Sequence, residues 1–372
     1  MSGRTAIALS GGIDSLVSAF LLKKAGQDLI GLHFLNGFEP HYVPPEAPPD
    51  PKKPLLIENP AETGYGKLHA DLLEMTADLR IPVQIFDCAL PFRKLVIDYF
   101  RETYQAGKTP NPCMVCNPRI KFGVMLAAAR GLGAENLATG HYVRTSKTQD
   151  GFIHLKKGLD VQKDQAYFLA RLTQDQLAGG CFPLGEMQKR AVIQLAGEQG
   201  LHPLVKRESQ DVCFIEGRTY RAFLADTLGV KPSPGDIEDA QGNRIGRHPG
   251  LHLFTIGQRR GLNCPSSDPY YVYGLDTARN VLKVGSKADL LSKSCLVGDI
   301  NWIIPPAATQ IRLQTRVRYR SPATDATVTV SGNTTSARVQ FDVPQTAVTP
   351  GQGAVFYRGD EILGGGWISR VG

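Results

Sequence analysis

Two groups of residues in this chain have the types and spacing that chemistry requires, a glycine-rich turn and a set of thiols. The turn Ser10–Ser15, with the sequence SGGIDS, follows the apolar run 5–9 and precedes an apolar-periodic stretch over 16–22. It therefore lies between an expected strand and an expected helix. Small residues let backbone N–H groups approach an anion, and the positive end of the helix dipole points at the same place. We predict that this turn binds phosphate.

Other phosphate-binding patterns do not fit the turn. No lysine follows its glycines as in the Walker A motif, and the glycines are adjacent, unlike those of GxGxxG. The alternative is a plain tight connection, because strand-turn-helix junctions with glycine are common in α/β proteins. The SGGxDS signature resembles the ATP pyrophosphatase (PP-loop) superfamily, whose members cleave ATP between the α- and β-phosphates and adenylate a carbonyl oxygen. This resemblance favours nucleotide binding.

Cys113 and Cys116 form a CxxC pair in the proline-containing segment 107–117. Three interpretations stay open at this point. The pair is half of a zinc site without its second half, a redox pair in an unsuitable context, or a nucleophilic thiol on an exposed loop. In the third case nearby cations favour the thiolate. The candidate cations are Lys108, Arg119 and Lys121.

Cys213 is a further thiol, which follows the basic pair Lys206–Arg207. Taken alone, it is typical of a small core residue. Paired with Cys116 it gains another meaning, since one thiol can carry a persulfide while the other resolves it by forming a disulfide. The chain has seven cysteines and no export signal, which argues against a disulfide framework.

Composition sets the outer bounds. A length of 372 residues predicts two or three domains, and a hydrophobic content of 42% is enough for their cores. The chain has no apolar run of about 18 residues, so we expect no membrane span. The first strand begins too early for a signal peptide, which predicts a cytoplasmic protein. The net charge of +7 indicates a polyanionic partner, although proteins without one also carry such a charge.

The elements that must position these groups alternate between short apolar runs and helical periods from residue 5 to 138. This pattern predicts a doubly wound parallel sheet, in which ligands bind beyond the carboxyl ends of the strands. Ser10–Ser15 and Gly140–His141 are then expected to line one crevice. The proline-rich segment 39–60 is expected to be a loop. The expected strands are 6–9, 29–34, 83–86 and 137–141, and the expected helices are 16–24, 68–79 and 92–104.

The remainder of the chain changes character twice. Helical periods continue over 165–177 and 188–200, and short strands and turns replace them near residue 206. From about residue 294 alternation dominates, which predicts a small β-barrel or sandwich. We expect domains at 1–205, 206–290 and 291–372, with strands at 311–319, 327–330 and 337–341.

The ordered set of motifs over nearly the whole chain resembles the tRNA-specific 2-thiouridylase family. Each motif is moderately specific, and their order is very specific. The motifs are SGGIDS at 10–15, TPNP with CN at 109–117, IKF at 120–122, ATGHY at 138–142, KDQAYFL at 163–169, CFI at 213–215 and TIGQRRGL at 255–262.

The resemblance implies a fold and a set of partners. The N-terminal domain would be a PP-loop, adenine nucleotide alpha hydrolase-like domain, followed by a small mixed central domain and a C-terminal β-barrel. ATP and Mg²⁺ would be the cofactors, with Asp14 placing magnesium and no separate metal site. The partners would be tRNA and a persulfide donor, either a cysteine desulfurase or a sulfur-relay protein.

The resemblance also implies roles for individual residues. Cys116 would be the nucleophile and Cys213 the persulfide carrier. The nucleotide positions are Ala8, Leu9, Ser10, Gly11, Gly12, Ile13, Asp14, Ser15, Phe34 and Gly140. The positions that contact tRNA or the target base are Asn111, Pro112, Cys113, His141, Lys163, Asp164, Gln165, Gln258, Arg318 and Tyr319.

The implied reaction is ATP-dependent 2-thiolation of the wobble uridine, in which adenylation of the C2 oxygen precedes sulfur transfer from a persulfide. Three alternatives stay open. Another PP-loop enzyme would adenylate a small carbonyl substrate. An iron–sulfur version of the same thiolation would use Cys113, Cys116 and Cys213 as ligands. An RNA-binding module without activity would keep the phosphate turn unused.

Overall fold

The computed structural model describes residues 3–39, 42, 44, 54–205, 212–215, 217, 219–227, 229–264 and 268–372. Most of the proline-rich segment and the basic pair Lys206–Arg207 lie outside the described residues. The chain divides into two compact units. The first comprises Met1–Ile97, Cys113–Phe214 and Asp360–Ile362, and the second comprises Asp98–Pro112, Ile215–Gly359 and Leu363–Gly372.

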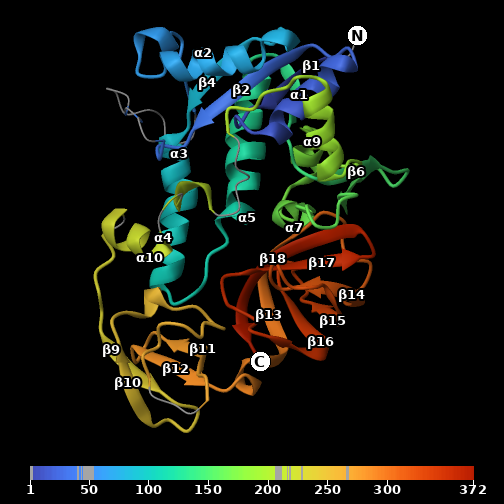
Figure 1. Cartoon of the computed structure of the whole chain (residues 1–372). Helices are drawn as coiled ribbons and strands as arrows, with labels where there is room; N and C mark the ends of the chain where they lie inside the picture. The colour runs from blue at the N-terminus through green and yellow to red at the C-terminus, as the bar shows by residue number, and fades with distance from the viewer. Residues whose placement is uncertain are drawn as a thin grey trace. The chain divides into compact units, whose positions relative to one another are not determined.

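The first unit is built on a six-stranded sheet in the order β3-β4-β2-β1-β5-β8 (Figure 1). All its pairings are parallel except that of β3 with β4, which confirms the predicted parallel sheet. Its strands are rich in buried aliphatic residues, as expected for a sheet covered on both faces. They are β1 (Arg4–Ala8), β2 (Leu29–Leu35), β3 (Leu55–Leu56), β4 (Val83–Asp87), β5 (Ala134–Ala138) and β8 (Gly180–Cys181).

Helices of the first unit follow the predicted periods with several changes. The helix expected over 92–104 begins earlier, in α3, and continues as the π-helix η3. The expected helix over 165–177 is split in two, because the capping box of Thr173 and Gln176 starts a new helix. The helix expected over 68–79 ends in a 3₁₀ turn. The helices are α1 (Ile13–Lys24), η1 (Pro60–Glu62), α2 (Gly66–Met75), η2 (Ala77–Leu79), α3 (Ala89–Phe92), η3 (Arg93–Ile97), α7 (Ala166–Leu169), α8 (Gln174–Ala178), α9 (Lys189–Glu198) and η5 (Cys213–Ile215).

The thiol segment differs most from its prediction. Instead of an exposed loop, residues 112–131 form α5 (Pro112–Cys116), the π-helix η4 (Asn117–Met125) and α6 (Leu126–Gly131). Pro112 stands at the start of a helix, where its fixed φ and missing N–H are tolerated. Pro118 follows within the helical run, and the local π geometry is one way to adjust the hydrogen bonding there. Both cysteines of the CxxC pair are half-buried, so the expectation of an exposed loop is wrong.

A hairpin that the sequence pattern did not indicate also belongs to the first unit. Its strands β6 (Val143–Lys147) and β7 (Ile153–Lys157) are antiparallel. β7 pairs in addition with Glu361 and Ile362 at the start of β18 (Glu361–Val371). A segment distant in sequence therefore completes the edge of this hairpin.

The second unit contains a four-stranded sheet in the order β10-β9-β12-β11 and a six-stranded barrel. The barrel runs β13-β16-β15-β14-β17-β18 and closes by pairing of β13 with β18, which confirms the predicted β-barrel. Its core is apolar and buried. The strands are β9 (Gly235–Glu238), β10 (Arg244–His248), β11 (Tyr271–Asp276), β12 (Val281–Gly285), β13 (Leu291–Trp302), β14 (Gln310–Arg316), β15 (Thr324–Val330), β16 (Ala337–Thr346) and β17 (Gly353–Arg358).

Short helices complete the second unit. The stacked rings of Tyr104 and Tyr220, with centroids 5.3 Å apart, join two of them. Across the described part of the chain, no helix combines the length and apolar character that a membrane crossing needs. The helices are α4 (Asp98–Gln105), α10 (Tyr220–Ala222), η6 (Phe223–Thr227), η7 (Leu251–Leu253) and η8 (Ala288–Leu290).

Candidate active site

The predicted phosphate turn joins β1 to α1 as expected. Gly11 has a φ of +80°, which an L side chain rarely adopts, so a glycine is required there. The Ser15 hydroxyl donates to the Gly12 carbonyl at 2.8 Å, and the Ser10 and Ser15 hydroxyls lie 3.3 Å apart. Val205 donates its N–H to the Gly11 carbonyl at 3.0 Å. The turn is therefore held in shape by its own hydroxyls and by a segment from the end of the unit.

Asp14, in the first turn of α1, is fully engaged. Lys189 Nζ lies 2.7 Å from Asp14 Oδ1 and 2.8 Å from Oδ2. Tyr142 donates its hydroxyl to the same Oδ1 at 2.8 Å. Lys189 is buried, although the sequence gave no signal for it, and it comes from the start of α9. A carboxylate that would repel phosphate is thus neutralised by a cation.

The other predicted nucleotide positions lie around this turn. Ala8 ends β1, Leu9 donates its N–H to the Leu32 carbonyl, and Phe34 lies in β2. Gly140 lies against the start of α1, since a Cβ at Gly140 would meet Asp14 Cβ at 2.9 Å and Ser15 N at 3.1 Å. The end of β5 therefore approaches the phosphate turn as closely as backbone can.

Three thiols of the first unit, those of Cys113, Cys116 and Cys213, are affected by the charge of Lys121. Cys116 ends α5, Cys213 begins η5, and Lys121 lies on η4. Burial raises the pKa of Cys116 to about 12, while the charge of Lys121 acts to lower it and the thiols of Cys213 and Cys113 act to raise it. Burial also raises the pKa of Cys113, again against Lys121. Of the three cations weighed from the sequence, Lys121 is the one that acts on these thiols.

Cys213 is solvent-exposed on its 3₁₀ turn. Burial of its sulfur atom nevertheless raises its pKa to about 11. The neighbouring Cys113 thiol acts in the same direction, and Lys121 acts in the opposite direction. The three thiols are therefore protonated at neutral pH in this state. For the CxxC pair, Lys121 favours the thiolate as the third interpretation expected, but burial outweighs its charge and the pKa values of both thiols are raised.

An aromatic cluster positions Cys213. Its neighbour Phe214 is buried and packs on Phe92 of α3 and on Phe38, with ring centroids 5.7 and 5.9 Å away. Rings in these tilted arrangements attract one another beyond their burial. Cys213 itself is solvent-exposed, contrary to the alternative of a small core residue. The core residue at this place is its neighbour Phe214.

His141 connects the thiols to the end of β5. Its Nδ1 lies 2.8 Å from Thr139 Oγ1, and its Nε2 lies 3.4 Å from Lys121 Nζ. Burial and then the charge of Lys121 hold its pKa well below the usual value. A neutral imidazole can accept a hydrogen bond from the Lys121 ammonium at Nε2, so His141 orients the cation of the thiol cluster.

Three predicted tRNA positions of the first unit, Lys163, Asp164 and Gln165, lie on a structured loop. The Asp164 carboxylate accepts from the N–H groups of Gly158 and Ala166 at 3.2 and 3.1 Å. Gln165 Oε1 accepts from the Tyr142 N–H at 3.1 Å. Lys163 donates its backbone N–H to Asp160. Asp164 and Gln165 thereby shape the loop that presents Lys163.

The second unit holds Asn111, whose N–H donates to the Tyr99 hydroxyl at 3.1 Å, and the last three predicted positions. Gln258 donates to the Arg260 carbonyl at 2.9 Å within its own turn. Arg318 donates to the Ile256 carbonyl at 2.8 Å and to Thr349, so it ties this turn to the barrel. Arg318 and Tyr319 follow the end of β14, which is shorter than the predicted strand.

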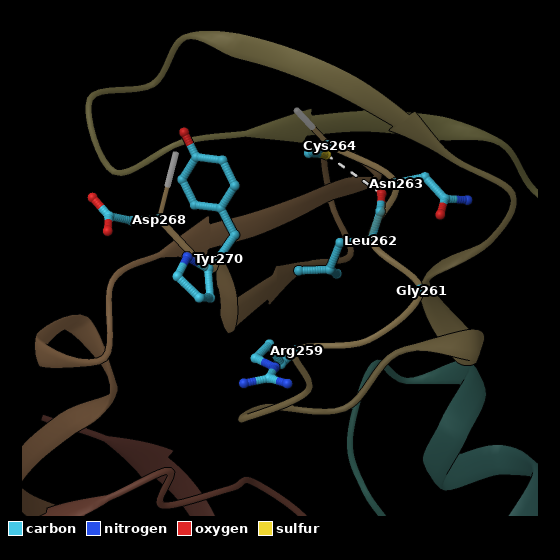
Figure 2. Close-up of a pocket in the computed structure, with 8 residues that line it drawn as sticks. Arg259, Gly261, Leu262, Asn263, Cys264, Asp268 and Tyr270 are labelled. Carbon is cyan, nitrogen blue, oxygen red and sulfur yellow. Dashed lines mark hydrogen bonds between the residues drawn. The ribbon is translucent and has the colours of Figure 1, made fainter. Parts of the chain in front are cut away.

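A pocket of about 300 Å³ lies next to Gln258 in the sheet part of the second unit (Figure 2). Figure 2 shows Asp268 and Tyr270 on one side and Asn263 and Cys264 on the other. Cys264 donates its thiol hydrogen to the Leu262 carbonyl at 3.4 Å. The remaining lining residues are Arg259, Gly261, Leu262 and Pro269.

The described residues hold no group of three or more His, Cys, Asp or Glu side chains placed to bind one metal ion. All seven cysteines are free. Three residues that shape the site had no assigned role in the sequence: Lys189, Tyr142 and Phe214. Tyr142 and Phe214 lie inside motifs, which is a usable signal, whereas Lys189 lies outside every motif.

The fold defines a class of protein, an α/β domain with a parallel sheet and a predicted phosphate turn, followed by a small sheet and a β-barrel. Residues 3–217 match the family described as tRNA methyl transferase HUP domain. Residues 221–286 match the tRNA methyl transferase PRC-barrel domain, and residues 292–368 match the aminomethyltransferase beta-barrel domain.

Relatives that match nearly the whole length of this chain identify its family more closely. The tRNA-specific 2-thiouridylase MnmA of Desulfosudis oleivorans is 48% identical over 98% of this chain and 94% of its own length. The protein of the same name from Trichlorobacter lovleyi is 42% identical over 99% of this chain and 98% of its own length. This chain belongs to the tRNA-specific 2-thiouridylase family.

Proposed function

We propose that this protein catalyses ATP-dependent 2-thiolation of the wobble uridine in tRNA, as a sulfurtransferase. The observation that carries the proposal is the pair Cys116 and Cys213, whose thiols interact in the same compact unit as the phosphate turn. A small-molecule adenylating enzyme needs the turn but has no use for this pair. The family relationship supports the same reaction.

ATP fits the phosphate turn. The hydroxyls of Ser10 and Ser15, the α1 N-terminus and the close approach of Gly140 offer donors and space for phosphate oxygens. A protein-bound Mg²⁺ at Asp14 does not fit, because both carboxylate oxygens lie within 2.8 Å of Lys189 Nζ. We therefore assign ATP to residues 8–15, Phe34 and Gly140, and assign no magnesium ligand to Asp14.

The reaction begins when the uridine C2 oxygen attacks the α-phosphate of ATP and pyrophosphate leaves. The terminal sulfur of a Cys213 persulfide then attacks C2, and AMP departs with the former C2 oxygen. The Cys116 thiolate attacks the inner sulfur of Cys213, which frees 2-thiouridine and leaves a Cys116–Cys213 disulfide. A dithiol reductant supplies two electrons to open it, and a persulfide donor reloads Cys213.

The raised thiol pKa values have a role in this sequence. A protonated Cys116 cannot attack the persulfide before the base arrives, so the carried sulfur is protected. Lys121 is the cation that stabilises the thiolate once its proton has left. The site therefore keeps a nucleophile inactive until a substrate changes its surroundings.

We assign tRNA binding to both units. Asn111, Pro112 and Cys113 face the target base, and Lys163, His141, Gln258, Arg318 and Tyr319 contact the tRNA with Asp164 and Gln165. The net charge of +7 and the polar pocket beside Gln258 support this assignment. We further propose domain limits of 1–205, 206–290 and 291–372 and a cytoplasmic location, where tRNA and reductants are available.

The direct test is mass spectrometry of tRNA nucleosides after reaction with purified chain, ATP and a persulfide donor. We expect 2-thiouridine at the wobble position and AMP formation that depends on tRNA. Full thiolation by a Cys213→Ala variant would contradict the persulfide role. AMP formation without tRNA would instead indicate a small carbonyl substrate, and neither product would indicate a binding module.

The mutual interaction of Cys113, Cys116 and Cys213 is the observation that favours an iron–sulfur version of the same reaction. The described residues contain no preformed metal-binding group, so this version requires the thiols to rearrange. Iron content and visible absorbance after anaerobic purification separate the two versions. Thiolation by iron-free protein would exclude the cluster.

A further inference from the structure

The residues of the phosphate turn supply no positive charge to balance the negative charge of a polyphosphate. SGGIDS contains no basic residue, and its one charged side chain, Asp14, is negative. The lysines of α1 stand in its last turn, at the far end of the helix. A polyphosphate that approaches the N-terminus of α1 would therefore meet a carboxylate with only hydroxyls and backbone donors beside it.

Lys189 brings a cation to this place from 175 residues further along the chain. Its ammonium group lies within 2.8 Å of both Asp14 oxygens, and its side chain is only 9% exposed, against 34% for Asp14. Lysine is rarely buried unless it is paired, so this arrangement costs desolvation that a surface ion pair avoids. The pair lies where the turn presents its phosphate-binding donors.

The position of Lys189 is fixed from two sides. Its backbone N–H donates to Asp160 Oδ2 at 2.9 Å at the start of α9. Tyr142 donates to Asp14 on the other side, and the Lys189 ammonium lies 6.0 Å from the Tyr142 ring centre. The cation is thus preorganised at the start of α1, which is how sites for developing negative charge are built.

We propose that Lys189 is the pyrophosphate-binding residue of this site, the cation that the phosphate turn itself lacks. Asp14 holds the ammonium in place and gives it up in part to the β- and γ-phosphates. Lys189 then stabilises the charge on pyrophosphate as it leaves the α-phosphate. This role rests on the proposed use of ATP.

The test is calorimetric binding of ATP, inorganic pyrophosphate and AMP to the full chain and to Lys189→Met. We expect the variant to lose at least about tenfold in affinity for ATP and pyrophosphate, equal to about 1.4 kcal/mol, and to keep its affinity for AMP. The matched control is Arg190→Met, which removes the same charge from an exposed neighbour. It should bind all three ligands as the unaltered chain does.

A double variant separates phosphate binding from mere neutralisation of Asp14. If Lys189 only cancels the carboxylate charge, Asp14→Asn combined with Lys189→Met restores pyrophosphate affinity, which would overturn the proposal. We expect the double variant to stay weak and Asp14→Asn alone to bind pyrophosphate more tightly. If Lys189→Met does not fold, Lys189→Arg, expected to keep affinity within a few fold, and Asp14→Asn carry the test.

Failure of this proposal is distinguishable from failure of the proposed function. If the unaltered chain binds neither ATP nor pyrophosphate, both fall. If it binds ATP and Lys189→Met binds ATP and pyrophosphate equally well, only the role of Lys189 falls.

Discussion

The phosphate turn and the thiol cluster lie in one compact unit and solve opposite problems. In the turn, the one carboxylate, Asp14, is paired with Lys189 and hydrogen-bonded by Tyr142. In the cluster, Lys121 acts to lower the pKa of three thiols, and burial outweighs it and keeps them protonated. The charges of the turn are paired with each other, whereas the thiols of the cluster are protonated.

This difference fits the roles that we propose for the two regions. Binding a polyphosphate benefits from donors and charges that need no rearrangement. Sulfur transfer benefits from delay, because a thiolate present too early would attack the persulfide without a substrate.

The largest effect is expected from removal of the Cys116 or Cys213 thiol. Cys116→Ser or Cys213→Ser should reduce single-turnover 2-thiouridine formation by about a thousandfold or more, and the double variant should be no worse, because the two act as a unit. Quantitative mass spectrometry of nucleosides measures this loss. ATP affinity should stay unchanged in both. Cys181→Ala, a half-buried thiol of the same unit, is the control and should retain activity.

A methyl group at Gly140 should damage the turn and spare the cluster. The added Cβ would lie 2.9 Å from Asp14 Cβ and 3.0 Å from its backbone carbon, which forces the start of α1 to move. We expect Gly140→Ala to lose about 1–3 kcal/mol of unfolding free energy. Its ATP affinity should fall as well. Denaturant unfolding and calorimetry measure both effects.

Gly197→Ala is the matched control for Gly140→Ala. Gly197 lies in α9, and nothing stands within 4 Å of an added Cβ there. Alanine should stabilise the helix by about 0.5–1 kcal/mol. Equal behaviour of the two variants would contradict the close approach at Gly140.

Loss of the shared cation should affect the cluster and leave the turn intact. With a pKa of about 11, the exposed Cys213 should react with iodoacetamide about tenfold faster for each pH unit between about pH 7 and 9. Lys121→Met should slow this reaction at each pH, because the thiolate loses its stabilising charge. Peptide mass spectrometry follows the alkylation. Arg119→Met, an exposed neighbour, should change nothing, and an equal loss there would disprove the special role of Lys121.

The smallest effect concerns His141. Its folded pKa lies below the unfolded value of about 6.5, so the unfolded chain binds the extra proton as the pH falls. His141 therefore opposes folding below about pH 6.5 and contributes no such penalty above it. Imidazole NMR signals should show a neutral ring at about pH 6. In Lys121→Met the His141 pKa should rise, and an unchanged titration would contradict the contact with Lys121.

The sequence alone predicted candidate chemistry for both regions. SGGIDS between an apolar run and a helical period predicts a phosphate turn, because the required conformation and donors are local properties of Gly11, Ser10 and Ser15. Alternating apolar residues likewise predicted the parallel sheet and the barrel, since hydrophobic periodicity reports local exposure. The pairing of Cys116 with Cys213 followed from thiol chemistry and from the family motifs.

The protonation states of these groups, and the contacts that position them, depend on the tertiary structure. The helix over 112–131 depends on burial that a segment rich in proline and cysteine does not reveal, and this burial raises the Cys116 pKa against Lys121. Lys189 reaches Asp14 across 175 residues, and Arg318 binds the Ile256 carbonyl across 62. Such contacts depend on where whole elements pack, so no local pattern records them. Residue types show which chemistry is available. Burial and distant partners determine the protonation state and the position of the groups that would perform it.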